Sequence, residues 1–253
     1  MSASDTSRDP PYSKLLPGRD EWPSTTYGGG FIAEAAMVAA GFEYKVVRSA
    51  TDCPPGFSPV VAASLIHVDD GLADALQSEG LSQVERQKFA RFVLRLSESA
   101  DTAEVERQRL EYITTETVRR IVSSALRAEK LFDWEARCRA VANFDEAIRL
   151  ATKVAETGGG ECSARAAEGA AGVGEAWEEG PGADACADAV AWAAKALEEA
   201  GECGPPQASR ARLIDDAVSI VEGALAIGKQ APEIDLALAL KRIEQITATK
   251  NRS

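Results

Sequence analysis

The sequence predicts an all-α fold, a multi-helix bundle of about eight or nine helices with a solenoid-like C-terminal helical extension. Apolar residues recur at three- and four-residue spacing in several long runs, as expected for amphipathic helices. Glycine and proline gather between these runs, where helices end. Aromatic residues make up only 6% of the 253 residues while alanine is abundant, and small side chains suit close helix–helix packing better than a β core.

The N-terminal elements follow from local composition. Residues 1–27 contain four prolines among polar residues, so we expect a flexible or loosely docked arm. A short apolar helix is predicted over 31–40, after a glycine triplet and before Gly41. The triplet lacks the lysine and serine or threonine of a phosphate-binding P-loop and is interpreted as a hinge. Residues 42–47 suit either a short strand or an extended connector.

Two further helices begin at recognisable caps. Ser58 is the predicted N-cap of a buried, apolar helix over 60–68, and the proline that follows it suits the first helical position. Ser82 and Glu85 form a capping box at the start of a helix over 84–96.

The clearest helix is predicted from Asp101 to Lys130, a run without glycine or proline. Asp101 and Glu104 form a capping-box pattern, in which each side chain can satisfy a free amide. The threonine-rich segment 114–117 is a poor helix former, so tertiary packing must hold the middle of this helix. A second long helix over 133–157 follows a short turn, and together the two are predicted to form an antiparallel hairpin.

After the glycines at 158–160 the composition shifts to alanine, glycine and glutamate. Four more helices are predicted there, over 161–177, 184–200, 213–227 and 234–246. We therefore divide the chain into a flexible N-terminal arm (1–27), a helical core (28–157) and an Ala/Glu-rich helical extension packed on the core (158–253).

Charge is distributed unevenly in this acidic chain, whose net charge is -12. Residues 82–139 carry 12 Lys/Arg against 10 Asp/Glu, whereas residues 161–202 carry 2 against 10. A net charge of this size makes binding to nucleic-acid phosphates unlikely. Solvated helix faces explain the pattern most simply; the alternative is that the two segments attract each other, within one chain or between copies.

Cysteine and histidine usage indicates a cytoplasmic protein with reduced thiols. The five cysteines form no CxxC pair, and with a single histidine a zinc site would need scattered thiols: Cys53, Cys138, Cys162, Cys186 and Cys203. The polar first residues do not resemble a signal peptide, and apolar runs fall short of the roughly 20 residues that span a bilayer. We therefore expect no membrane association.

An aspartate motif suggests a metal site. Asp69, Asp70 and Asp74 have the DDxxxD form of the first magnesium-diphosphate motif in some class I isoprenoid synthases, which are also all-helical. Carboxylates at i and i+4 share a helix face and can hold hard cations. Residues resembling further metal ligands are Asp184, Asp188, Asp215, Asp216, Ser219 and Glu222, although the glutamate falls one residue early. Gly71, the short chain and the few aromatics count against this resemblance, and the simpler interpretation is an exposed turn after a helix that ends at Asp70.

Five arginines are the candidates for an interaction surface: Arg86, Arg91, Arg95, Arg119 and Arg120. They could bind nucleic acid or a phosphate ligand, but nearby glutamates dilute their charge, so a solvated face is the simpler interpretation.

The stretch from Cys53 to Leu96 resembles some uncharacterised bacterial proteins. The run CPPGFSPVVAASLIHVDDGL, followed by VERQKF and VLRL, is similar to a Cys–Pro–Val–Ala–Ala helix, an Asp-Asp-x-Leu turn and an Arg-Leu segment that precede an Ala-rich helical tail in those proteins. The resemblance covers roughly 100 residues, carries no known activity and so assigns no functional residue.

These observations favour a non-enzymatic helical interaction or assembly protein that binds a protein partner or itself. His67 is the only histidine, so it is the only candidate for the general base of a serine or cysteine triad, and a ferritin-like pair of Glu-x-x-His motifs cannot form. We therefore expect no catalytic residues and no cofactor. The alternative is a magnesium-dependent enzyme, or a binder of a diphosphate ligand, that uses the Asp-rich helix faces.

Overall fold

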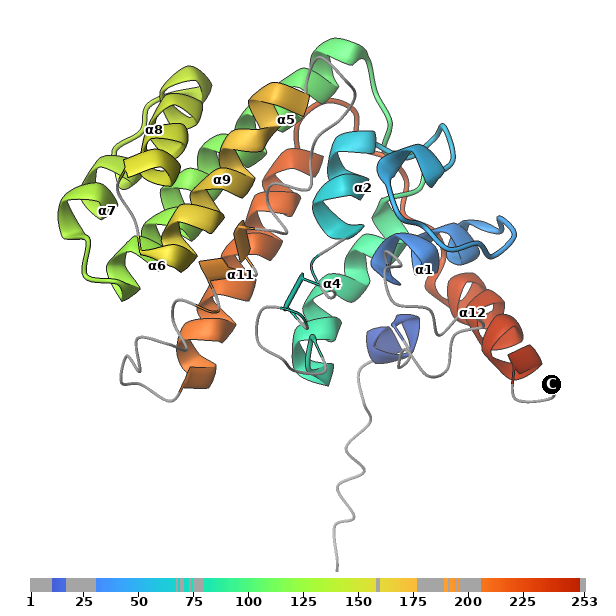
Figure 1. Cartoon of the computed structure of the whole chain (residues 1–253). Helices are drawn as coiled ribbons and strands as arrows, with labels where there is room; N and C mark the ends of the chain where they lie inside the picture. Colours follow the sequence, from blue (N-terminus) through green and yellow to red (C-terminus); the bar gives the residue numbers. More distant parts are fainter. Residues whose placement is uncertain are drawn as a thin grey trace, which may run out of the picture.

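The chain folds into packed helices, as the computed structural model shows (Figure 1). The structure describes residues 11–16, 31–66, 80–157, 160–176 and 206–250, together with 68, 71, 72, 74, 189, 190, 192, 193 and 195. These residues form no strand, which confirms the all-α class, and residues 42–47 are an irregular connector. The elements, in chain order, are η1 (Pro11–Leu15), α1 (Phe31–Ala40), η3 (Ala50–Asp52), α2 (Pro59–Ile66), α4 (Gln83–Arg95), α5 (Ala103–Glu116), η4 (Thr117–Val122), α6 (Ser123–Ala128), α7 (Phe132–Arg139), α8 (Phe144–Thr157), α9 (Glu161–Ala176), α11 (Pro206–Leu225) and α12 (Leu236–Lys250).

The predicted caps of α2 and α4 are confirmed. The Ser58 hydroxyl accepts the Val61 amide at 3.2 Å, and helix α2 starts at the proline after Ser58. At α4, the Ser82 amide donates to the Glu85 carboxylate at 2.8 Å while the Ser82 hydroxyl accepts the Glu85 amide at 3.4 Å. These reciprocal bonds satisfy amides that have no partner within the helix.

The central helical run consists of α5, η4 and α6 without interruption. Its N-cap is Thr102, whose hydroxyl accepts the Val105 amide at 3.3 Å. The helix therefore begins one residue later than the predicted cap at Asp101. The Asp101 carboxylate instead accepts the amide of Lys229 at 2.8 Å and so ties the turn after α11 to the start of α5.

The middle of this run, η4, is a π-helix. A π turn is wider than an α turn and frees backbone carbonyls. The Ser123 hydroxyl compensates by donating to the carbonyls of Arg119 (2.5 Å) and Arg120 (3.2 Å). In contrast, the buried hydroxyls of Thr114 and Thr117 have no hydrogen-bond partner. The threonine-rich segment that was predicted to need tertiary support is thus where the regular helix changes geometry.

The single helix predicted over 133–157 is wrong, because the chain forms two helices, α7 and α8. The break lies at Asn143: the Glu146 amide donates to the Asn143 side chain at 3.0 Å, as at a helix N-cap, and the Glu146 carboxylate accepts the amide of Ala142, the residue before this cap, at 2.8 Å. Asn143 and Glu146 have the N-cap and N3 spacing, so this signal was present in the sequence.

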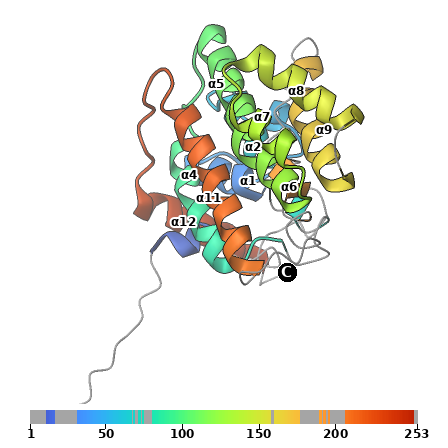
Figure 2. The ribbon, with the colours of Figure 1, turned by 90° about the vertical axis from the view of Figure 1, so that its left-hand side faces the viewer.

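The C-terminal helices pack on different parts of the molecule. Helix α9 lies against α8, α11 runs along α5 and α4, and α12 packs on α1 (Figures 1 and 2). Helix α11 begins at Pro206, seven residues before the predicted start at Leu213. These contacts do not confirm a solenoid-like arrangement. The predicted helix over 184–200 lies largely outside the described residues. No helix in the described ranges is both long and apolar enough to cross a membrane.

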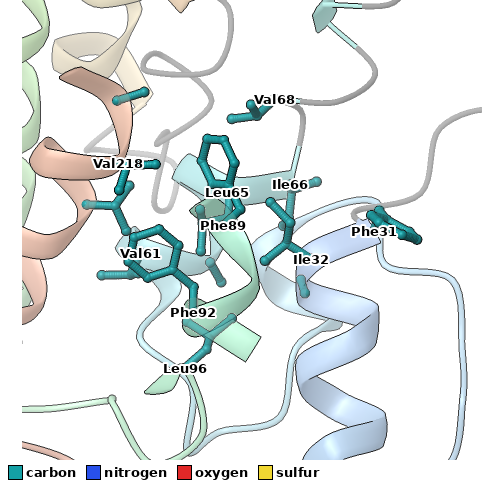
Figure 3. Close-up of a cluster of buried hydrophobic side chains, with 14 of the residues drawn as sticks. Phe31, Ile32, Val61, Leu65, Ile66, Val68, Phe89, Phe92, Leu96 and Val218 are labelled. Carbon is teal, nitrogen blue, oxygen red and sulfur yellow. The ribbon is translucent and has the colours of Figure 1, made fainter. Parts of the chain in front are cut away.

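Two groups of buried side chains form the interior. The larger joins α1, α2, α4, α5, α11 and α12; Phe89 and Phe92 of α4 lie between Val61 and Leu65 of α2 and Val218 of α11 (Figure 3). The smaller group lies between η4, α6, α7, α8 and α9. Burial of a Phe or Leu side chain stabilises a fold by about 1.5–3 kcal/mol, so these clusters hold the helices together.

A buried ion pair fixes the start of α5. The side chain of Arg109 is 0% exposed and lies 2.7 Å from Glu106. Arg109 also donates to the Ser99 carbonyl (2.7 Å) and to the Ile227 carbonyl (2.9 and 3.2 Å). Glu106 in turn accepts the Ser58 hydroxyl at 2.6 Å. The Arg109–Glu106 pair therefore joins four segments: Ser58 before α2, Ser99 before α5, the first turns of α5, and the turn after α11.

Candidate functional site

Helix α11 carries acidic residues that face the basic side of α4. Lys88 lies 2.7 Å from Asp215, and Arg91 forms an ion pair with Glu222. Arg95 lies 3.9 Å from Glu222 and 3.8 Å from Glu233, which follows α11. Two of the predicted interaction arginines, Arg91 and Arg95, are therefore neutralised within the chain. Because these pairs are partly exposed, each contributes little to stability.

The predicted metal ligand Asp216 lies among arginines. Arg120 of η4 approaches its carboxylate at 3.9 Å and donates to the Ser219 hydroxyl at 3.2 Å. Arg212 and Arg139 are close enough for their charges to act on the same carboxylate. Burial nevertheless raises the pKa of Asp216, and this outweighs the opposing attraction of the arginines. A site surrounded by guanidinium groups disfavours a metal cation and favours an anion.

The raised pKa of Asp216 gives a stability prediction. A carboxyl group whose pKa is higher in the folded than in the unfolded state loses stability as pH rises through the interval between the two values. Asp216→Asn is therefore expected to leave the urea midpoint at pH 7 equal to or above that of the wild type. The difference should vanish at pH 3, below the ordinary carboxyl pKa of 3.8, where Asp216 is protonated. A lower midpoint at pH 7 would mean that the attraction of the arginines exceeds the cost of burial.

The other predicted metal ligands do not come together in the described structure. Asp69, Asp70, Asp184 and Asp188 lie outside the described residues, as does His67, and Asp74 is exposed. Among the residues that are described, no three His, Cys, Asp or Glu side chains are grouped as a metal site would require. Asp215 and Glu222 face the cations of α4 instead.

The remaining predicted arginines have different environments. Arg119 is held by three groups, the Glu116 carboxylate (2.7 Å), the Val141 carbonyl (2.7 Å) and the Ala142 carbonyl (3.3 Å), so it connects η4 to the α7–α8 loop. Arg86 is partly exposed and forms no ion pair with any other residue that the structure describes. Arg119 is thus mainly structural. Arg86 differs from the other four predicted arginines, each of which pairs with a described carboxylate.

Arg120, which the sequence singled out, is grouped with three arginines that it did not, and the four side chains come from η4, α6, α7 and α11. We call the following side chains the arginine surface: Arg120, Arg127, Arg139 and Arg212. Carboxylates lie between them. Glu116 pairs with Arg119 and Arg120 at 2.7 Å each, and Glu135 pairs with Arg127 at 3.5 Å and Arg139 at 3.4 Å. Asp216 lies beside Arg120, as described above.

Helix α7, which carries Arg139, also carries aromatic side chains. Phe132, at the start of α7, is 58% exposed, which is unusual for a large apolar side chain. Phe132, Glu135 and Arg139 are spaced i, i+3 and i+7 and so share one face of α7. On another face, the Arg137 guanidinium stacks 4.4 Å from the centre of the Trp134 ring. Exposed aromatic and arginine side chains are the residues most enriched at protein–protein interfaces.

Two of the described thiols, those of Cys53 and Cys138, are not activated. Burial raises the pKa of Cys53 to about 11 and that of Cys138 to about 12, so both are protonated at neutral pH. Cys162 is also buried.

Comparison with protein-family models, with curated proteins and with solved structures finds no match to this chain. The similarity of the Cys53–Leu96 stretch to bacterial proteins therefore rests on the quoted residues alone. Function has to be argued from the site itself.

Proposed function

We propose that the protein is a non-enzymatic interaction protein that binds a protein partner, or another copy of itself, through the arginine surface. The observation that carries this proposal is the grouping of four arginines and the exposed Phe132 on η4, α6, α7 and α11 of an acidic chain. Glu116 and Glu135 between them are nearly buried, whereas the Arg127 and Arg139 side chains face solvent. This arrangement supports recognition of an anionic group by a prepared surface.

Unused N–H donors on Arg127 and Arg139 explain why a partner would gain binding free energy at the arginine surface. A guanidinium has five N–H donors. Among the residues that the structure describes, Arg127 has one hydrogen bond, at 3.5 Å to Glu135, and the approach of Arg139 to the same carboxylate is 3.4 Å. Most of their N–H groups therefore face water and remain available for carboxylates of a partner. Arginine pairs bidentately with carboxylates, which gives both affinity and orientation.

The test is the dependence of association on this surface. Arg127→Gln combined with Arg139→Gln removes two of its cations. Arg149→Gln combined with Lys153→Gln, on the exposed side of α8, is a control with the same change of charge. We expect the wild type to self-associate or to retain a partner at low salt, and to release it at high salt, in light scattering and affinity capture. The first variant should bind at least about ten-fold more weakly, because charge-assisted hydrogen bonds are lost, while the control should bind as the wild type does.

Two results would contradict the proposal. One is a wild-type chain that stays monomeric at every salt concentration and captures no partner. The other is an association that the Arg127/Arg139 variant and the control weaken equally, since this would show a response to net charge alone. Circular dichroism should show equal helix content in both variants, so that a loss of folding is not mistaken for a loss of binding.

A further inference from the structure

Nearly buried carboxylates restrain the side chains of three arginines in the arginine surface. The side chain of Glu135 is only 11% exposed, whereas its partners Arg127 and Arg139 are 58% and 49% exposed. Glu116, 10% exposed, holds Arg120 in the same way. A shared carboxylate restrains two long side chains at once, so a ligand that binds these arginines has less conformational entropy to remove.

The surface also has an excess of positive charge. Five arginines lie there if Arg119 is counted, against the three carboxylates Glu116, Glu135 and Asp216; Asp215 is also near Asp216 but is paired with Lys88 of α4, so two positive charges remain without a counter-charge. The rest of the chain is strongly acidic. The net charge of -12 disfavours a nucleic acid, which is charged along its whole length, whereas a peptide with a few carboxylates can be neutralised by these arginines alone. The charge pattern therefore favours a short ligand over nucleic acid.

The exposed ring of Phe132 further restricts which chemical class of ligand fits the arginine surface. Its exposed ring lies on the same face of α7 as Arg139, so a ligand that neutralises the arginines can also bury an apolar side chain against Phe132. Inorganic anions lack such a group. The complementary ligand is thus a peptide segment with several carboxylates and at least one apolar side chain.

The chain itself contains a segment with this chemistry. Residues 177–188, which lie outside the described residues, read WEEGPGADACAD and contain four Asp/Glu, no Lys/Arg and one tryptophan. We infer that the arginine surface of one copy binds residues 177–188 of a second copy, an inference that rests on the proposed function. Charge complementarity and the exposed Phe132 carry it: four carboxylates meet an excess of guanidinium groups, and Trp177 meets the phenylalanine.

Such a contact is head-to-tail, because the two surfaces that meet are different. Each copy keeps one free arginine surface or one free acidic segment after pairing, so assembly continues unless a ring closes. The average mass measured by light scattering is therefore expected to rise with protein concentration beyond that of a dimer at low salt. A symmetric contact would stop at the dimer.

Two complementary variants of the full chain test the pairing. One carries Arg127→Gln and Arg139→Gln and so keeps only the acidic segment. The other carries Glu178→Gln, Glu179→Gln, Asp184→Asn and Asp188→Asn and so keeps only the arginine surface. Each alone is expected to be monomeric, whereas the mixture should form a one-to-one complex that cannot grow. A mixture that stays monomeric overturns the inference, and a wild type that stays monomeric while the mixture pairs overturns it in favour of pairing within a single copy.

A synthetic peptide of residues 177–188 gives a second readout that does not depend on the stability of a variant. Added to the wild type at low salt, it should disperse the assemblies and bind at least about ten-fold more tightly than the same peptide with Gln and Asn at its four acidic positions. Equal binding of the two peptides, or no binding, overturns the inference. If the chain instead captures a different protein in an Arg127- and Arg139-dependent manner, the proposed function stands and only the choice of a second copy falls.

Discussion

Replacing Arg109 with methionine is expected to lower the free energy of unfolding by about 3–5 kcal/mol. The guanidinium is fully buried and satisfies the Glu106 carboxylate and the carbonyls of Ser99 and Ile227. Methionine fills a similar volume but donates no hydrogen bond. Glu106 would then be a nearly buried charge without its cation, and two carbonyls would lose their donors. Urea unfolding followed by circular dichroism measures the loss.

Arg107→Met is the matched control for this prediction. Arg107 is on the same helix and pairs with Glu104 and Glu111, but its side chain is 42% exposed. Water and salt screen those pairs, so the loss should be a small fraction of that for Arg109. If the two substitutions destabilise the protein equally, the four segments do not depend on the Arg109 guanidinium in the way the geometry indicates.

The parts of the fold that could be predicted from the sequence are those that depend on residues close together in the chain. The caps at Ser58 and at Ser82–Glu85 involve neighbours within three residues, and both are confirmed. The break between α7 and α8 also follows from a local signal, at Asn143 and Glu146, but it was hidden inside a run of apolar residues with helical spacing. The start of α11 could not be placed because its first turns follow a stretch rich in glycine and proline.

Which arginines stay available for a partner was less predictable, because the contacts of α11 with α4 and η4 join residues far apart in sequence. Arg91 and Glu222 are separated by 131 positions, and Arg120 and Ser219 by 99. Sequence alone showed an excess of arginine over 82–139 but not which arginines α11 would neutralise. The structure assigns Arg91 and Arg95 to the α4–α11 contact and leaves Arg127 and Arg139 exposed. Exposure of Phe132 likewise depends on packing, since its position at the start of a helix fits either environment.

Replacing Thr114 and Thr117 with valine is expected to stabilise the protein, although both positions are in the core. Their hydroxyls are buried without a hydrogen-bond partner, and an unsatisfied buried polar group costs about 1–3 kcal/mol. Valine has nearly the same shape and no polar atom, so each substitution should raise the free energy of unfolding by about that amount at most. The urea midpoint should increase for each single variant and increase further for the double variant.

Thr115→Val is the control that separates a buried hydroxyl from an unsatisfied one. Its hydroxyl donates to the Glu111 carbonyl at 2.7 Å, so the same change of side chain removes a bond there and should give no gain. If Thr114→Val and Thr117→Val instead destabilise the protein as Thr115→Val does, their hydroxyls find partners in solution. The π-helix would then have a different local geometry from the one described. If the double variant is stabilised and still self-associates, binding at the arginine surface does not depend on the two unsatisfied hydroxyls.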